Sequence, residues 1–187
     1  MARWQPDARG RLAQAAMELY VEQGYERTTV AEIAERAGLT ERTFFRHFGD
    51  KREVLFAGSA DLVHLLTERV AGAPAGATPL AAVSDALQAV GAVIQERGEW
   101  SKQRQAVIAA NAELRERELI KLASLASALA AALRARRVKE PAASLTAEAG
   151  VAAFKVAFER WVEQPAKRNL PRLIRDAFES LKAVTAQ

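Results

Sequence analysis

Residues 29–51, TVAEIAERAGLTERTFFRHFGDK, carry two short helical patterns on either side of a glycine. Thr29 is followed three residues later by Glu32, which is the spacing of a capping box at the N-terminus of a helix. Gly38 can adopt the left-handed conformation that ends this helix, and Thr40 can cap a second one. The stretch therefore predicts two short helices joined by a sharp turn.

Apolar residues recur at helical spacing in both of these helices. On the first helix they share one face, which consists of Val30, Ile33, Ala34 and Ala37. On the second helix, Phe44 and Phe48 stand one turn apart and are expected to face inward. Two helices joined in this way form a helix-turn-helix, whose second helix can enter the major groove of DNA.

Basic side chains are concentrated in one place within this part of the chain. The 187 residues have a net charge of +4, but residues 1–56 contain nine Lys and Arg and nine Asp and Glu. The positive and titratable side chains crowd the second helix and the residues just after it: Arg42, Arg46, His47, Lys51 and Arg52. Their placement, and not the bulk charge, indicates a surface that contacts nucleic acid.

Composition excludes several classes of protein. The chain has no cysteine, which excludes disulfides, thiolate chemistry and Cys-ligated zinc and is typical of a reducing compartment. The N-terminal MARWQPDARG lacks the apolar core of a secretion signal, and the longest uncharged apolar run, 122–133, is far shorter than the ~20 residues of a membrane span. The chain has two histidines and no paired-carboxylate or glycine-loop signature. We therefore predict a cytoplasmic protein that is not an enzyme, uses no cofactor or metal and does not enter a membrane.

Helical periodicity continues along the rest of the chain. No segment alternates with period two, so the fold class is predicted to be all-α with about nine helices and no sheet. The first helix is expected to begin at Pro6 and Asp7 and to end at Gly24. Asp50 is expected to cap a fourth helix, which fades into AGAPAGATP (71–79), a linker-like stretch. Five further helices are expected at about 79–98, 100–110, 112–137, 144–163 and 170–184.

Four submotifs at fixed mutual spacing resemble those of the TetR family of transcriptional regulators. They are G-Y-x-x-T-T-V (24–30), I-A-x-x-A-G-L-T (33–40), T-F-F-R-H-F (43–48) and D-K (50–51). The resemblance covers roughly residues 7–60, and beyond them only the number and order of helices and an aromatic penultimate helix correspond. It implies a helix-turn-helix DNA-binding domain at 1–56, with the recognition helix at about 40–47, and an effector-binding and dimerisation domain at 57–187. The implied partners are double-stranded operator DNA, a lipophilic small-molecule effector and a second copy of the chain, and the default mode of action is repression.

The resemblance assigns DNA contacts residue by residue. Thr29 would bind a phosphate through its backbone N–H and hydroxyl, as helix N-termini do. His47 and Lys51 would also contact phosphates, and base edges would face the first turn of the recognition helix, which holds Thr40, Glu41, Arg42 and Thr43. An arginine at position 42 can pair with guanine or reach a phosphate, and both alternatives stay open.

Other basic and aromatic residues near the helix-turn-helix have two interpretations each. Phe45 and Arg46 are included among the DNA-binding residues, but Phe45 stands where the family often has tyrosine, so a phosphate hydrogen bond is lost and apolar contact remains. Arg3, Arg9 and Arg11 form either a solvated end or an arm that follows phosphates or the minor groove. The two histidines also have structural alternatives, His47 as a half-buried core residue and His64 as a packing or interhelical residue rather than a pocket residue.

Candidate effector and dimer residues come from the second half of the chain. Trp100 follows a glycine at a helix junction and has polar neighbours, as an effector pocket requires. The predicted pocket consists of Trp100, Gln103, Arg104, Val107, Asn111, Phe154 and Phe158. The dimer interface implied by the resemblance is a four-helix bundle of the last two helices, with Val151, Trp161, Leu173, Ile174, Ala177, Phe178 and Leu181. The aromatic stripe of the penultimate helix can also be ordinary core, and the alternative function is a helical adaptor without specific DNA binding.

Overall fold

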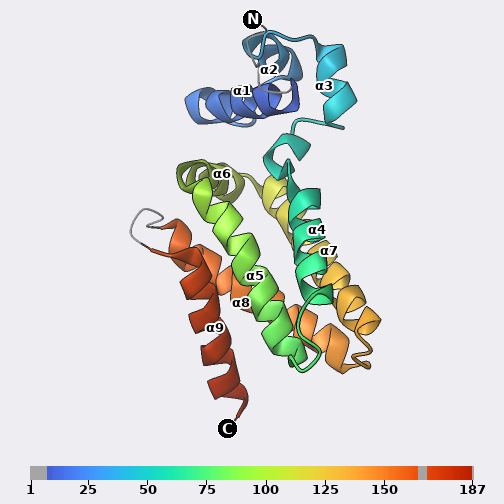
Figure 1. The fold of residues 1–187 in the computed structure, drawn as a ribbon. Coiled ribbons are helices and arrows are strands. Elements are labelled where there is room, and N and C mark those ends of the chain that lie inside the picture. The colour runs from blue at the N-terminus through green and yellow to red at the C-terminus, as the bar shows by residue number, and fades with distance from the viewer. Residues whose placement is uncertain (1–7, 164–167, 187) are drawn as a thin grey trace, which may run out of the picture. The chain divides into compact units, whose positions relative to one another are not determined.

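The computed structural model describes residues 8–163 and 168–186, and all regular structure within these ranges is helical (Figure 1). The elements are α1 (Ala8–Gln23), α2 (Val30–Arg36), α3 (Glu41–His47), the 3-10 helix η1 (Glu53–Phe56), α4 (Ser59–Ala71), α5 (Pro79–Glu96), α6 (Gly98–Ala110), α7 (Ala112–Ala135), α8 (Ala142–Val162) and α9 (Leu170–Thr185). The prediction of an all-α fold with nine helices is confirmed for this part of the chain. None of the helices in the described ranges is both long and apolar enough to cross a membrane.

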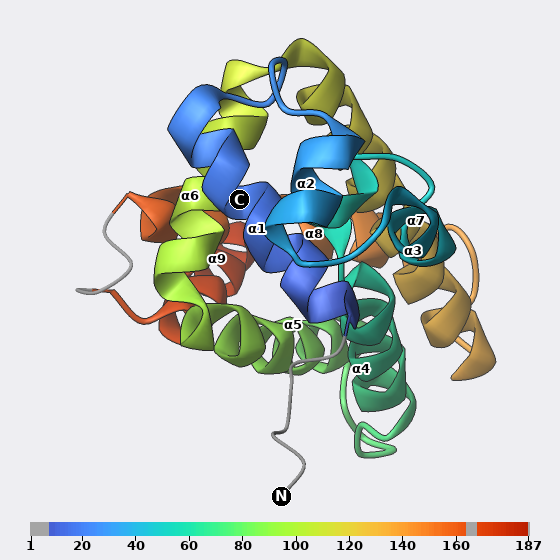
Figure 2. The same cartoon turned by 90° about the horizontal axis from the view of Figure 1, so that it is seen from above.

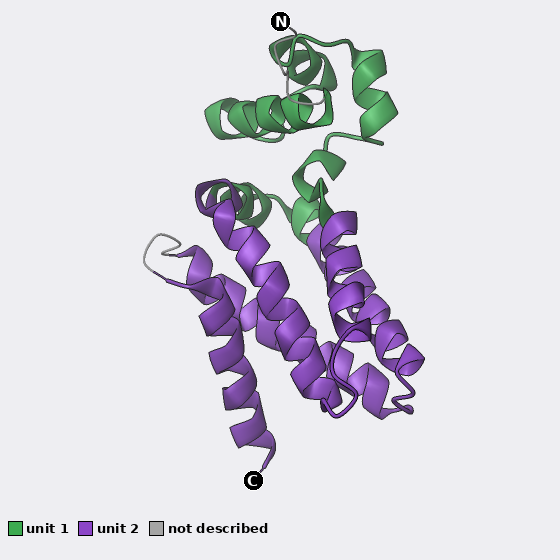
Figure 3. Ribbon diagram, viewed as in Figure 1, with its two compact units in different colours: residues 1–59, 103–115 green, residues 60–102, 116–187 purple. Residues whose placement is uncertain are grey.

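The chain divides into two compact units (Figure 3). Unit 1 consists of the described residues up to Ser59 together with 103–115, and unit 2 consists of 60–102 and the described residues from 116 onward. We predicted that everything after residue 56 belongs to one domain, whereas 103–115 groups with the N-terminal helices. The chain therefore crosses between the units within α4, α6 and α7.

The start of α2 and of α3 in unit 1 follows from local side-chain chemistry. Thr29 and Glu32 form the expected capping box at the start of α2, and Thr40 caps α3 by accepting a hydrogen bond from Thr43 N–H at 3.2 Å. Gly38 has φ +64°, and the N–H of Leu39 donates to Ala34 O at 2.8 Å to close the end of α2. Each such cap contributes about 1 kcal/mol, so these bonds fix where the two short helices begin.

The core of unit 1 lies among α1, α2 and α3, which pack against one another (Figure 2). Its fully buried side chains include Leu12 and Ala16 from α1, Ile33 from α2 and Phe44 from α3. Burying a leucine, isoleucine or phenylalanine side chain stabilises the fold by about 1.5–3 kcal/mol, and α3 depends on the burial of Phe44 because an isolated helix of two turns is unstable in water. The orientation of α3 is therefore set by its apolar face.

The predicted fourth helix is divided into two pieces. Asp50 accepts hydrogen bonds from the N–H groups of Arg52 and Glu53 at 2.8 and 3.2 Å, but these start only the single turn η1. Gly58 then adopts φ +84°, which ends η1, and α4 begins at Ser59. The left-handed glycine is the physical reason why one continuous helix from Asp50 does not form.

Unit 2 is built on the packing of α5 against α8 and α9 (Figures 1 and 2). Two glycines lie where the helices approach most closely. A Cβ atom at Gly150 of α8 would come within 2.5 Å of Val83 Cγ1, and one at Gly91 of α5 within 2.6 Å of Ile174 Cδ1. The core around them is continuous and includes Leu129 and Leu133 of α7 and the fully buried Trp161.

The stretch 71–79 is a fixed loop within unit 2. Arg136 at the end of α7 donates hydrogen bonds to the carbonyl oxygens of Ala71, Ala73 and Pro74 at 3.2, 2.6 and 2.9 Å. Thr78 then caps α5 by accepting from Ala81 N–H at 3.2 Å. The Gly- and Pro-rich composition therefore marks a turn between α4 and α5, and both helices it joins contribute to the same core.

Candidate nucleic-acid interface

Helix α3 is anchored on one face and open to solvent on the other. Phe44 is fully buried and Phe48 nearly so, with their ring centroids 5.5 Å apart. The exposed residues at the N-cap and along the outer face are Thr40, Glu41, Arg42, Phe45 and Arg46, with Thr43 half-buried. The end of the helix that was predicted to face base edges is thus accessible to a groove.

Arg42, Phe45 and Arg46 give this outer face its chemistry. In the described part of the chain, no carboxylate lies within ion-pair distance of either guanidinium group. Guanidinium groups in this state suit phosphate oxygens or the edge of guanine. Phe45 is 56% exposed and meets Phe44 edge-on at 5.4 Å, so its outer ring surface is available for apolar contact.

The N-terminus of α2 carries its own anion. Glu32 Oε2 accepts from the Thr29 N–H at 2.7 Å and from the Thr29 hydroxyl at 2.8 Å. These two bonds hold the pKa of the Glu32 carboxyl below its usual range. The donors that we expected to bind a phosphate are therefore occupied by Glu32 in this structure, and a phosphate has to displace that carboxylate to use them.

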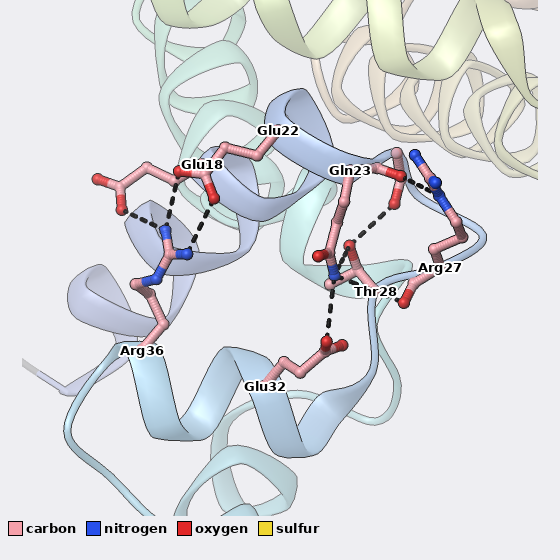
Figure 4. A network of polar contacts seen from close by, with 8 residues as sticks. Glu18, Glu22, Gln23, Arg27, Thr28, Glu32 and Arg36 are labelled. Atoms are coloured by element: carbon pink, nitrogen blue, oxygen red, sulfur yellow. Dashed lines mark hydrogen bonds and ion pairs between the residues drawn. The ribbon is translucent and has the colours of Figure 1, made fainter.

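A polar network joins α1 to α2 beside this cap (Figure 4). Gln23 Nε2 donates to Glu32 Oε1 at 3.3 Å and to Thr28 Oγ1 at 3.4 Å. At the other end of α2, both Arg36 nitrogens donate to the two oxygens of Glu22, at 3.0 and 2.9 Å. This hydrogen-bonded pair lowers the pKa of Glu22. The network holds α2 in place at both ends.

Lys51 does not present its ammonium group as a phosphate contact. Its Nζ donates to the carbonyl oxygens of Tyr25 and Thr28, both at 2.9 Å, and of Glu26 at 3.4 Å. The same atom lies 4.3 Å from the centroid of the Tyr25 ring. The predicted role is corrected for this structure because the three donors of the group are directed at the chain's own backbone.

The remaining basic residues near α3 belong to unit 1 and differ in exposure, since Arg9 is exposed and His47 and Arg11 are half-buried. His47 is half-buried, and its Nε2 is buried with no hydrogen-bond partner among the described residues. Arg9 and Arg11 lie in the first turns of α1, and the Arg9 guanidinium is 5.6 Å from the centroid of the Phe48 ring. Arg9 and Arg11 thus lie on a helix in this structure, and their contact with DNA stays a prediction, while Arg3 lies outside the described residues.

Segment 103–115 contacts η1 and Arg52, the residue just before it. Arg104 Nε donates to Leu55 O at 2.7 Å, and its guanidinium carbon lies 5.0 Å from the Phe56 ring centroid. Glu113 Oε1 forms an ion pair with Arg52 Nη1 at 2.8 Å. These contacts lie within unit 1 and explain why this segment of α6 and α7 groups with the helix-turn-helix.

The seven residues of the predicted effector pocket fall in both units. Arg104 is bound to η1, and Asn111 Nδ2 donates to Val107 O at 2.7 Å, so these polar groups stabilise unit 1 and are not free for a ligand. Gln103 and the buried Val107 belong to the same segment, whereas Trp100 and the stacked pair Phe154–Phe158 belong to unit 2. The sequence missed that the polar neighbours of Trp100 serve the other unit.

A shallow recess of about 160 Å³ does occur on unit 2, away from the predicted pocket residues. Its lining consists of Ala126, Ser127, Ala130, Arg134, Ser144 and Glu148. His64, the other residue considered for a pocket, has a side chain that is 72% exposed and lies 3.3 Å from Glu68 Oε1. The packing interpretation of His64 is therefore wrong for this structure, and the pocket interpretation stays a prediction.

Part of the predicted dimer interface is core of a single chain. Trp161, Ile174 and Phe178 have no exposed surface and Val151 is 8% exposed, because α8 and α9 pack these residues against α5. A residue buried within its own chain cannot contact a partner, so these four assignments are corrected. Leu173, Ala177 and Leu181 are half-exposed on α9 and remain candidates.

Comparison with family models decides where the chain belongs. Residues 12–57 match the model described as bacterial regulatory proteins, tetR family, and residues 77–186 match the TetR C-terminal model described as the MftR C-terminal domain. The two matches cover both ends of the described fold. The chain belongs to the TetR family of bacterial regulatory proteins.

Curated relatives resemble the chain over part of its length. The HTH-type transcriptional regulator TcmR of Streptomyces glaucescens is 43% identical over 82 residues, which are 44% of this chain and 36% of TcmR. The uncharacterized HTH-type transcriptional regulator YvkB of Bacillus subtilis is 47% identical over 47 residues, which are 25% of each chain. The matched region thus spans only about a third or less of these relatives.

Solved structures of other proteins share the fold over almost the whole chain. The SmeT–triclosan complex has a TM-score of 0.68 at 20% identity, covering 96% of this chain and 91% of that one. The regulator FadR of Bacillus subtilis in complex with stearoyl-CoA has a TM-score of 0.64 at 19% identity, covering 91% of this chain and 95% of that one. At this identity the likeness establishes the architecture, including the order of helices after α4.

Several surface residues of this TetR-family member were missed by the sequence argument. Large apolar side chains are exposed on α8 and α9, namely Leu145 at 65%, Val156 at 52% and Val184 at 72%. The signal was present as a second apolar stripe on α8, formed by Leu145, Ala149, Ala152 and Val156. It was overlooked because α8 is apolar around most of its circumference, so periodicity alone does not say which face is buried.

Proposed function

We propose that the chain is a sequence-specific DNA-binding transcriptional regulator that binds a near-palindromic operator as a dimer, represses, and is released by a small molecule. The observation that supports DNA binding is the geometry of α3. Phe44 and Phe48 fix one face of the helix in the core, and Arg42, Phe45 and Arg46 stand exposed on the other face. A helix that is anchored in the core and carries guanidinium groups with no ion-pair partner among the described residues is suited to a major groove.

Arg42 and Arg46 are proposed to make different contacts with DNA, Arg42 with a base edge and Arg46 with a phosphate. Arg42 lies in the first turn of α3, from which recognition helices reach base edges, and it can donate two hydrogen bonds to guanine. Arg46 lies one turn further on and is assigned to a phosphate. Phe45 lies between them in sequence and is assigned to sugar or to a thymine methyl group, because it has no hydroxyl to donate.

A second copy of the chain is proposed to cover the exposed apolar stripes of α8 and α9. On α8 the stripe is Leu145, Ala149, Ala152 and Val156, and on α9 it is Leu173, Ala177, Leu181 and Val184. Two such stripes meet their own copies in an isologous interface, which has two-fold symmetry. The symmetry provides two recognition helices, and a palindromic site requires two.

An apolar effector is proposed because the core of unit 2 is rich in small and aromatic side chains. Ala147, Ala153 and Ala157 on α8 are buried beside the stacked rings of Phe154 and Phe158. Two of the proteins with the same fold were solved with triclosan and with stearoyl-CoA, respectively. These two compounds are therefore the first probes for release of operator DNA, and loss of binding with either one supports an apolar effector.

The decisive experiment is the selection of bound sequences from random double-stranded DNA with the full chain. A regulator should enrich one near-palindromic sequence and bind it about 10³-fold or more tightly than scrambled DNA of the same length. Affinity for both should fall with salt, since phosphate contacts release counterions. Binding without sequence preference at all salt concentrations would reject the regulator and favour a helical adaptor.

A further inference from the structure

We infer that Lys51 is a positioning residue, whose ammonium group fastens the loop before α2 and does not bind a DNA phosphate. The inference rests on the proposed DNA binding and concerns how one residue contributes to it. All contacts that support it lie within unit 1.

The ammonium group of Lys51 is held on several sides. Two carbonyl oxygens, of Tyr25 and Thr28, lie at 2.9 Å from Nζ, and that of Glu26 lies at 3.4 Å. The Tyr25 ring contributes a cation–π contact at 4.3 Å. An ammonium group has three N–H donors, so this cradle uses its whole hydrogen-bonding capacity.

The loop that Lys51 fastens leads directly to the N-terminus of α2, which the resemblance to the TetR family predicts to lie against a phosphate. Residues 24–29 connect α1 to α2 and form few regular backbone hydrogen bonds, among them Thr28 N–H to Tyr25 O at 3.3 Å. Thr28 is 1% exposed, and Thr29 is the N-cap of α2. The carbonyls of the loop need donors, and Lys51 supplies them from a distant point in the sequence.

Lys51 is also fixed through its own backbone. The hydroxyl of Tyr20, a buried residue of α1, donates to Lys51 O at 2.7 Å. Burial raises the pKa of the Tyr20 phenol far above its usual range, with smaller contributions from Tyr25 and Asp50, so the group stays a donor. The rings of Tyr20 and Tyr25 are 5.4 Å apart. Lys51, which lies just before η1, is therefore bound to α1 through its backbone and to the loop 24–29 through its side chain.

To bind a phosphate, the Lys51 ammonium group would have to break its hydrogen bonds to the loop carbonyls. Moving it would leave the carbonyls of Tyr25 and Thr28 without their charged donor and release the loop that orients Thr29. The arrangement thus favours an indirect effect, in which Lys51 keeps the N-terminus of α2 at the position where it meets DNA. The two roles differ in one measurable quantity, because each phosphate contact adds about 0.9 to the slope of log K against log salt.

The test compares full-length variants on the operator obtained by selection and on random-sequence duplex DNA. Lys51→Met removes the charge, Lys51→Arg keeps it but replaces the compact ammonium by a planar fork that fits phosphates better than this cradle. Tyr20→Phe removes only the bond to Lys51 O, and Arg46→Met serves as the phosphate-contact control. The readouts are the salt slope, the affinity, and hydrogen exchange of the amides of Thr28, Thr29 and Glu32 without DNA.

If Lys51 positions the loop, Lys51→Met, Lys51→Arg and Tyr20→Phe weaken operator binding with an unchanged slope, and exchange of the three amides quickens by about tenfold. Arg46→Met instead makes the salt dependence of log K less steep by about one and leaves amide exchange unchanged. The inference is overturned if Lys51→Met lowers the slope by about 0.9, or if Lys51→Arg restores full affinity. Failure of the proposed function shows differently, as a lack of sequence preference in the unaltered chain.

Discussion

An arginine in the first turn of a recognition helix can contact either a guanine edge or a phosphate, and Arg42 is free to do either. Its side chain is exposed and has no ion-pair partner among the described residues. If it donates two hydrogen bonds to guanine, Arg42→Ala should relax the preference at one position of each half-site by about 1–3 kcal/mol. Binding to a set of operators with single base substitutions measures this directly.

The matched control for Arg42 is Arg46, one turn further along α3. Arg46→Ala should weaken all operators in the set by a similar factor and lower the salt slope by about one. An Arg42→Ala protein that keeps the preferred sequence, and loses affinity uniformly, would place Arg42 on a phosphate instead.

The cap of α2 makes the stability of unit 1 depend on pH through Glu32. Hydrogen bonds from the Thr29 N–H and hydroxyl lower the pKa of Glu32 in the folded chain. A carboxyl with a lowered folded pKa stabilises the fold above its unfolded pKa, and that stabilisation is lost as the pH falls through the folded value, below about pH 4. Glu32→Gln should therefore lower the melting temperature at pH 7, and the difference from the unaltered chain should shrink toward pH 3.

Thermal unfolding followed by circular dichroism over this pH range tests the role of Glu32. Glu35→Gln is the matched control because it removes one exposed carboxylate from the same helix. A difference between Glu32→Gln and the unaltered chain that stays constant from pH 7 to pH 3 would show that the carboxylate does not act as the cap described.

Among the helices, those with local signals could be predicted from the sequence and those without could not. The capping box at Thr29 and the inward pair Phe44 and Phe48 were sufficient for α2 and α3, because caps and periodicity act within one or two turns. The division between η1 and α4 depends on Gly58 adopting φ +84°, and a glycine inside an apolar pattern gives no warning of its dihedral angle. The contact of Lys51 with the loop before α2 lay beyond reach because it joins residues more than twenty positions apart.

The packing of α5 against α8 depends on the absence of a side chain at Gly150. A Cβ atom there would come within 2.5 Å of Val83 Cγ1, and both residues lie in the core of unit 2. Gly150→Ala should destabilise the protein by about 1–3 kcal/mol, since overpacking forces helices apart or side chains off their rotamers. Urea unfolding gives the free energy.

The matched test of this close approach is the double variant Gly150→Ala with Val83→Ala. Removing the two methyl groups of Val83 leaves room for the added one, so the double variant should be more stable than the sum of the two single changes implies. Additive effects would mean that Val83 and Gly150 do not limit the approach of α5 to α8.

At the scale of the whole molecule, the two compact units are not consecutive in sequence. Residues 103–115 belong to unit 1 through Arg104 and Glu113, although they lie between two stretches of unit 2. Helices α4, α6 and α7 each continue from one unit into the other. The two units are therefore covalently joined at three places, each within a helix.

The proposed dimer yields the sharpest prediction for the whole molecule, because α8 and α9 each have one buried and one exposed apolar face. Val156 is 52% exposed on α8, whereas Phe178 on α9 is fully buried within the chain. Val156→Asp should leave the helical content and melting of the monomer nearly intact while separating the dimer and weakening operator binding. Phe178→Asp should instead prevent folding, because it places an unpaired charge in the core. Sedimentation together with circular dichroism distinguishes these outcomes, and a Val156→Asp protein that remains dimeric at micromolar concentration would place the interface on another surface.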